Sequence, residues 1–192
     1  MRAEDASKTI RGVDGLLLPL GFKRRARSQE WGKSTGADRE WVHLNFGKSV
    51  TIHPSFGVQY RDLLQVIPEL PGPVDGTVRM LSSLFHPSRQ YSSEDPPEPL
   101  IGDIRDTALP GLTALRDRES VIEQLRASLA SAWPVPSYSH RIRLLPLLLA
   151  RLGRVDEALD AATSFESESV GRDQIVPGYD VFLRVFRATL AA

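Results

Sequence analysis

The chain contains no cysteine among its 192 residues. Disulfides, thiolate catalysis and cysteine-ligated zinc or iron–sulfur centres are therefore excluded. No apolar run approaches the roughly 20 residues that a bilayer-spanning helix needs. The apolar stretch "LLLPL" near the start is too short for a signal peptide and lacks a small-residue cleavage pattern. These absences predict a cytoplasmic protein with no membrane partner.

Sequence motifs of common enzyme classes are missing as well. The sequence has no Walker-type phosphate loop, no Gly-rich dinucleotide fingerprint and no Gly-x-Ser-x-Gly. We therefore expect no cofactor and no metal, and the sequence favours a protein that is not an enzyme.

Charge is balanced overall but unevenly distributed. The net charge is zero, yet residues 1–60 hold ten Lys or Arg against six Asp or Glu, and the remainder carries the opposite excess. A domain that binds nucleic acid over its whole surface is usually more basic than this. Any nucleic-acid role would therefore rest on the N-terminal part.

The first element that the sequence predicts is an amphipathic helix over residues 4–20. Apolar residues recur there at helical spacing, namely Ile10, Val13, Leu16, Leu17 and Leu20. Gly21 is expected to end this helix, because glycine is common directly after a helix C-terminus.

Three antiparallel strands are predicted after the helix, over residues 22–31, 39–49 and 50–60, where the periodicity changes towards alternation. The segment "GKSTGAD" at 32–38 is predicted to be a turn or loop from its composition. The helix is expected to cover the face that carries Val42, Leu44 and Phe46.

Helices dominate the predicted remainder. Residues 61–70 and 73–85 are expected to form short helices, and the Pro-rich segment 86–110 is expected to be a loop or linker. Residues 111–192 form a helical region, in which "LLLARLGRVDEALDAA" predicts a helix–turn–helix hairpin. The fold class is α+β, with an N-terminal helix on a small sheet of about three strands. Residues 1–85 and 111–192 are expected to pack as one globular unit.

The basic run after Gly21 is the first candidate binding surface. Lys23, Arg25 and Arg27 would share one face of a strand, where they could track phosphates, hold an acidic protein or form a solvated face that discourages edge pairing. Trp31 and Trp41 would lie at the two ends of the hairpin and could stack on bases. The solvated face is the simplest interpretation, followed by an acidic protein partner and then by nucleic acid.

Two histidines form the second candidate. His43 and His53 lie on neighbouring predicted strands and could approach each other. Zinc needs three or four ligands, and no further ligand accompanies them. A small hydrolase that uses either histidine as a general base is the weakest alternative, because no nucleophile is fixed by spacing.

Several short segments resemble a loose group of bacterial domain-of-unknown-function proteins. The marks are an N-terminal helix that leads to "GFKR" at 21–24, a β-hairpin, Pro110 with Leu112 and Leu115, and a Leu-Gly-Arg-x-x-Glu-Ala turn at 152–158. The resemblance implies an immunity or accessory protein of bacterial toxin systems. Together with the absent motifs, it predicts a protein-binding module that is not an enzyme, with nucleic-acid binding as the alternative.

Overall fold

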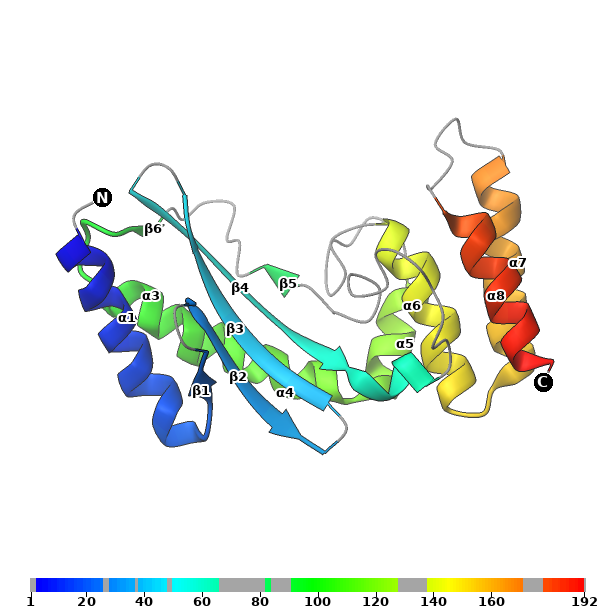
Figure 1. The fold of residues 1–192 in the computed structure, drawn as a ribbon, viewed down its shortest axis with the longest axis horizontal. Coiled ribbons are helices and arrows are strands. Elements are labelled where there is room, and N and C mark those ends of the chain that lie inside the picture. The colour runs from blue at the N-terminus through cyan, green and yellow to red at the C-terminus, as the bar shows by residue number, and fades with distance from the viewer. Residues whose placement is uncertain are drawn as a thin grey trace. The chain divides into compact units, whose positions relative to one another are not determined.

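The computed structural model describes residues 3–25, 28–36, 38–47, 50–65, 82–83, 91–127, 138–170 and 178–191. The chain divides into two compact units (Figure 1). The sheet unit comprises Met1–Gln59 and Leu81–Arg116, and the helical unit comprises Tyr60–Met80 and Asp117–Ala192. Each unit is therefore built from two separate stretches of the chain. The fold is α+β, as the sequence predicts.

The N-terminal helix α1, Ala3–Leu17, continues as a short 3-10 turn over Leu18–Leu20 and ends where the sequence predicts. Gly21 has a left-handed φ of 86°. Its amide donates to the Leu18 carbonyl at 3.0 Å, and the Phe22 amide donates to the Leu17 carbonyl at 3.2 Å. This pair of bonds is the Schellman motif, in which the left-handed residue allows the last carbonyls of a helix to be satisfied.

We expect Gly21→Ala to lower the free energy of unfolding by about 1–2 kcal/mol, because a side chain is strained in the left-handed region. Gly15→Ala is the matched control within the same helix. A Cβ at Gly15 would meet nothing within 4 Å, so alanine should stabilise the helix by about 0.5–1 kcal/mol. Urea unfolding of both variants tests the contrast, and two changes of the same sign would contradict it.

The sheet is larger than the predicted three strands. Among the described residues it has six strands, in the order β1-β2-β3-β4-β5 with β6 also paired to β4. The strands are β1 Lys23–Arg24, β2 Glu30–Thr35, β3 Asp38–Phe46, β4 Thr51–Tyr60, β5 Ser82–Ser83 and β6 Tyr91–Ser92. Strand β2 pairs antiparallel with β1 and β3, and β4 pairs antiparallel with β5 and β6.

One face of the sheet packs against helices. Arg24 pairs with Trp31 and Trp31 pairs with Val42 across the ladders, so these residues share a face. The Trp31 Nε1 donates to Asp14 of α1 at 2.8 Å, and Glu40 of β3 accepts from Arg116, at the end of helix α4 (Leu109–Arg116), at 3.2 Å. The prediction that the first helix covers the Val42 face is therefore confirmed.

The single basic strand predicted over 22–31 is wrong. Strand β1 has two residues only, and beyond it the Ser28 amide donates to the Arg25 carbonyl at 3.1 Å. The predicted loop over 32–38 is instead largely strand β2, which turns into β3 at Gly36 with φ 61°. The Arg39 guanidinium packs closely over Gly32, since a Cβ there would lie 2.6 Å from one of its nitrogens.

Two further segments differ from the sequence prediction. Ser82 and Ser83 form strand β5 inside the segment expected to be a helix over 73–85, most of which lies outside the described residues. Within the segment 86–110, residues from Glu98 onward are helical rather than loop. The helices are α3 Glu98–Asp103, a π-helical segment Ile104–Ala108 and α4 Leu109–Arg116.

The helical unit contains the predicted hairpin. Its elements are a 3-10 turn at Arg61–Gln65 and helices α5 Arg118–Arg126, α6 Tyr138–Arg151, α7 Val155–Val170 and α8 Tyr179–Leu190. Helices α6 and α7 meet through a turn in which Gly153 has φ 77°. The Gly153 amide donates to Ala150 and the Arg154 amide to Leu149, both at 3.0 Å, so α6 ends in the same motif as α1.

A buried ion cluster joins three elements of the helical unit. The Asp62 carboxylate, 9% exposed, accepts two bonds of 2.8 Å from Arg118 of α5 and one of 2.9 Å from Arg151 of α6. The Arg118 guanidinium also lies 5.2 Å from the Tyr60 ring centroid. Two arginines with a shared carboxylate thus connect α5, α6 and the 3-10 turn.

None of the described helices combines the length and the apolar character that a bilayer span requires.

Candidate functional site

The first candidate surface is the corner where α1 ends and β1 begins. We define this basic corner by Leu18, Leu20, Lys23, Arg24, Arg25 and Lys33. The Leu18 and Leu20 side chains are 47% and 44% exposed, whereas most other large apolar side chains in the described residues are buried. Exposed leucines beside cations make a surface with both apolar area and positive charge.

The cations of the corner come from two adjacent strands. Lys23, Arg24 and Arg25 are exposed at β1. Lys33 of β2 lies 5.7 Å from the centroid of the Phe22 ring, and its Cε would be 3.8 Å from a Cβ on Gly21. The corner therefore carries Arg24 and Lys33 on the helix-covered face of the sheet, Lys23 on the opposite face and Arg25 beyond β1.

One carboxylate partly balances these charges. Asp14 lies 3.4 Å from the Arg24 guanidinium, and it also accepts the Trp31 bond. Within the described part of the chain, no ion pair or hydrogen bond involves the side chains of Lys23 or Arg25. Net positive charge at the corner is therefore left to face solvent.

The structure separates the residues that the sequence groups together. Lys23 pairs with Gly32, so it lies on the face opposite Arg24, as predicted. Arg25 is exposed beyond β1, and Arg27 lies outside the described residues. Trp31 shares the helix-covered face and is 0% exposed, so it offers no stacking surface.

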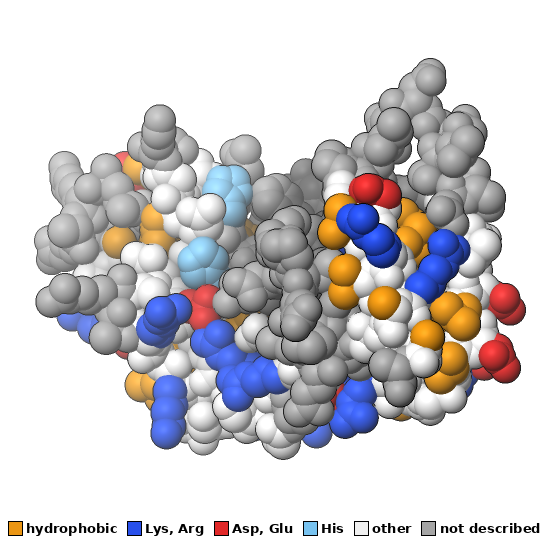
Figure 2. Space-filling model, turned by 45° about the vertical axis from the view of Figure 1, so that its right-hand side comes forward, with side chains coloured by type: hydrophobic (Ala, Val, Ile, Leu, Met, Phe, Trp, Pro, Cys, Tyr) orange, Lys and Arg blue, Asp and Glu red, His pale blue; other side chains and the backbone are white. Residues whose placement is uncertain are grey.

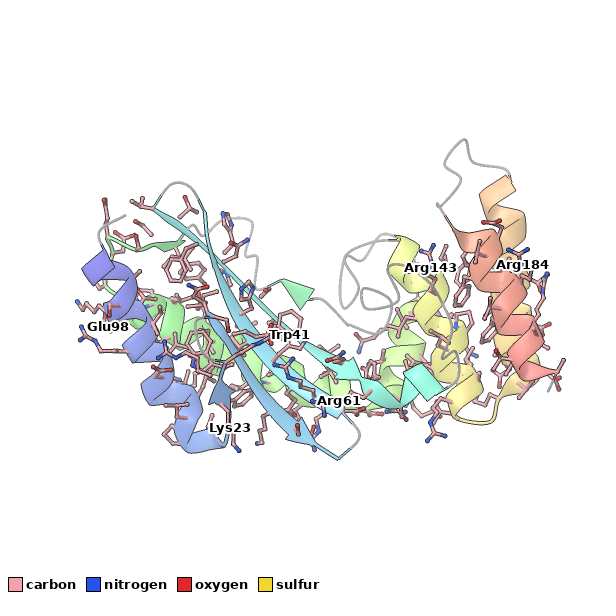
Figure 3. All side chains as sticks on the ribbon, viewed as in Figure 1. Lys23, Trp41, Arg61, Glu98, Arg143 and Arg184 are labelled. Carbon is pink, nitrogen blue, oxygen red and sulfur yellow. The ribbon has the colours of Figure 1, made fainter. Side chains whose placement is uncertain are left out.

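Trp41, His43 and Lys23 belong to the outer face of the sheet, opposite the helices. Trp41 pairs with Gly32 and His43 with Glu30. Trp41 is 5% exposed, and its Nε1 has no hydrogen-bond partner in the part of the chain that the structure describes. Figure 3 labels Lys23 and Trp41 at separate places on this unit.

The histidines lie on this outer region of the sheet without assembling a catalytic group. Figure 2 shows histidine side chains on the sheet unit, above a group of Lys and Arg side chains. His43 faces Glu30 across the ladder, but that carboxylate is held by Arg39 at 2.5 Å. Within the described ranges, no group of three His, Asp or Glu side chains is placed to hold a metal ion. The described part of the structure therefore adds no further candidate catalytic residue to the hydrolase alternative.

Sequence reasoning missed three residues of this region. Leu18 and Leu20 fit the helical pattern, and nothing in the pattern signals that the capping turn leaves them exposed. Lys33 was placed in a loop, although its register opposite Glu40 brings it onto a strand. The presence of a basic surface was signalled by the sequence, but its apolar part was not.

No protein-family model matches this chain, and no curated protein or solved structure matches it either.

Proposed function

We propose that this chain is a non-enzymatic protein-binding module and that its basic corner binds an acidic surface of a partner protein. The observation that carries the proposal is the pair of exposed leucines, 47% and 44% accessible, beside Lys23 and Arg25. Interface centres favour apolar area, and charge at the rim mainly raises the association rate and selects the partner.

The shape of the corner favours a protein over nucleic acid. A nucleic-acid surface of the predicted kind needs aromatic rings on which bases stack. Trp31 is buried and hydrogen-bonded to Asp14. Exposed leucines contribute to a protein interface and offer no contact to phosphates. An immunity-like or accessory role, which the resemblance implies, and a cytoplasmic location both remain predictions. Both agree with a protein-binding module.

Charge reversal tests the corner directly. We expect the double variant Lys23→Glu, Arg25→Glu to weaken partner binding by about tenfold or more, because it replaces attraction by repulsion at the interface. Lys8→Glu, Arg11→Glu is the matched control, since both residues are exposed on α1 and make the same change in net charge. Tagged wild type and both variants would be used to capture partners from a lysate of the native host, with and without nuclease.

The proposal is supported if one protein is recovered in an amount near-equal to that of the tagged chain, with or without nuclease. That protein should be lost with the Lys23→Glu, Arg25→Glu variant and kept with the Lys8→Glu, Arg11→Glu control. The apolar contribution has its own control, because Leu20 and Leu152 occupy the same position in two identical helix caps. Leu20→Ser should weaken capture and Leu152→Ser should not. Recovery that depends on nucleic acid, or that survives both corner variants, would refute the proposal.

A further inference from the structure

A pocket of about 300 Å³ lies in the sheet unit, away from the basic corner. Its walls are mainly apolar and come from α1, β4, β6, the segment that leads into α3 and the first turn of α3. They include Ile52, Tyr91, Pro96, Pro97, Pro99 and Leu100. This volume is at the small end of ligand-binding pockets, which suits a small molecule rather than a peptide.

The walls are held in place by close contacts. The Tyr91 hydroxyl donates to Asp103 of α3, which fixes its ring in the wall. On the other side, Gly12 lets α1 approach α3 closely, since a Cβ there would lie 2.5 Å from Ile101 Cδ1 and 3.9 Å from Pro97 Cβ. A pocket whose walls are already fixed binds with little ordering cost.

The charge at the pocket has one sign. Among the described residues that line it, Asp95 is the single charged side chain, and the polar remainder is Thr9 and Ser92. Glu94 and Glu98 flank Asp95, and all three carboxylates are exposed. Figure 3 labels Glu98 beside α1. In the described part of the chain, none of the three is in an ion pair.

We propose that this pocket binds a small organic amine. The apolar body of the amine lies among the proline rings, Ile52 and Leu100, and its ammonium group faces Asp95. Anions are disfavoured, because the one charged side chain among the described lining residues is the carboxylate of Asp95. Fully apolar ligands gain the same burial but leave the carboxylate without a counter-charge. This site is independent of the basic corner and of the partner proposed for it.

The test uses three probes of nearly equal size on the full chain. Phenethylammonium is the cation, phenethyl alcohol is the neutral analogue and phenylacetate is the anion. In NMR titrations we expect the cation to bind about two- to fivefold more tightly than the alcohol, as for a single exposed ion pair. Phenylacetate should bind more weakly than both. The methyl signals of Ile52 and Leu100 should shift, while that of Leu112 should not.

The matched variants are Asp95→Asn and Glu94→Gln. Both replace an exposed carboxylate by an amide, but Asp95 lines the pocket and Glu94 does not. Asp95→Asn should abolish the preference for the cation over the alcohol, and Glu94→Gln should keep most of it. Equal affinity for cation and alcohol in the wild type, an equal effect of the two variants, or shifts located elsewhere would overturn the proposal.

Discussion

Asp62→Ala should destabilise the helical unit by about 1.5–3 kcal/mol, the usual range for hydrogen bonds to charged groups, because Asp62 is buried while its arginine partners keep part of their exposure. The substitution leaves Arg118, whose side chain is 18% exposed, without its two bonds of 2.8 Å. It also releases Arg151, which is 44% exposed and can regain water. The larger part of the loss therefore comes from Arg118.

Hydrogen exchange followed by peptide mass spectrometry would locate this loss. Protection should fall in α5 and α6, while peptides of β2 and β3 in the other unit should change little. Asp160→Ala is the control, because Asp160 is an exposed carboxylate of α7, and it should cost less than about 0.5 kcal/mol. Equal protection in the two variants would show that the cluster contributes little to stability.

The same cluster predicts an acid-sensitive stability. Burial raises the pKa of Asp62, but the hydrogen bonds and charges of Arg118 and Arg151 outweigh it, and the net pKa is below the ordinary value of 3.8. A lowered pKa in the folded state means a contribution that is present above about pH 4 and is lost as the pH falls through the folded value. The stability difference between wild type and Asp62→Ala should therefore shrink as the pH falls below about 4.

Trp31→Ala should destabilise the sheet unit by about 3–5 kcal/mol, the usual cost of truncating a large buried aromatic side chain. Trp31 is 0% exposed and fills the space between β2 and α1. Its removal also leaves Asp14 without the Nε1 donor at 2.8 Å. Both losses act on the contact between the helix and the sheet.

Trp31→Phe separates the two contributions. Phenylalanine keeps much of the apolar volume but cannot donate to Asp14, so we expect a cost of about 1–3 kcal/mol. Urea unfolding combined with exchange in the α1 and β2 peptides would measure both variants. A cost below about 1 kcal/mol for Trp31→Ala would contradict the role of this side chain in the core.

The sequence predicted those helices and strands whose periodicity or end signal lies within the element itself. Helix α1 and its end at Gly21 follow from helical spacing and one glycine, and β3 and β4 follow from alternation. The prolines of 86–110 misled the prediction. Pro99 occupies the second position of α3, where the missing N–H costs nothing. Pro110 lies inside the continuous helical run of 98–116, directly after the π-helical turn in which the Leu109 amide donates to the Ile104 carbonyl.

Elements that depend on distant contacts were missed. Strand β2 has glycine, lysine and serine in place of β-branched apolar residues, and its placement as a strand depends on its pairing with β3 from Glu30↔His43 to Thr35↔Asp38. The chain reversal between Arg25 and Ser28 interrupts the alternation that placed Trp31 with Lys23. One unforeseen turn thus moved a candidate binding residue into the core.

The division of each unit into two stretches sets an order for synthesis. The sheet unit has all its residues once Arg116 is made. Asp62, by contrast, must wait 56 residues for Arg118 and 89 for Arg151. At about 5–20 residues per second, translation of 89 residues takes roughly 4 to 18 seconds. Vectorial synthesis therefore favours folding of the sheet unit first, while the Asp62 carboxylate stays hydrated until its arginines leave the ribosome.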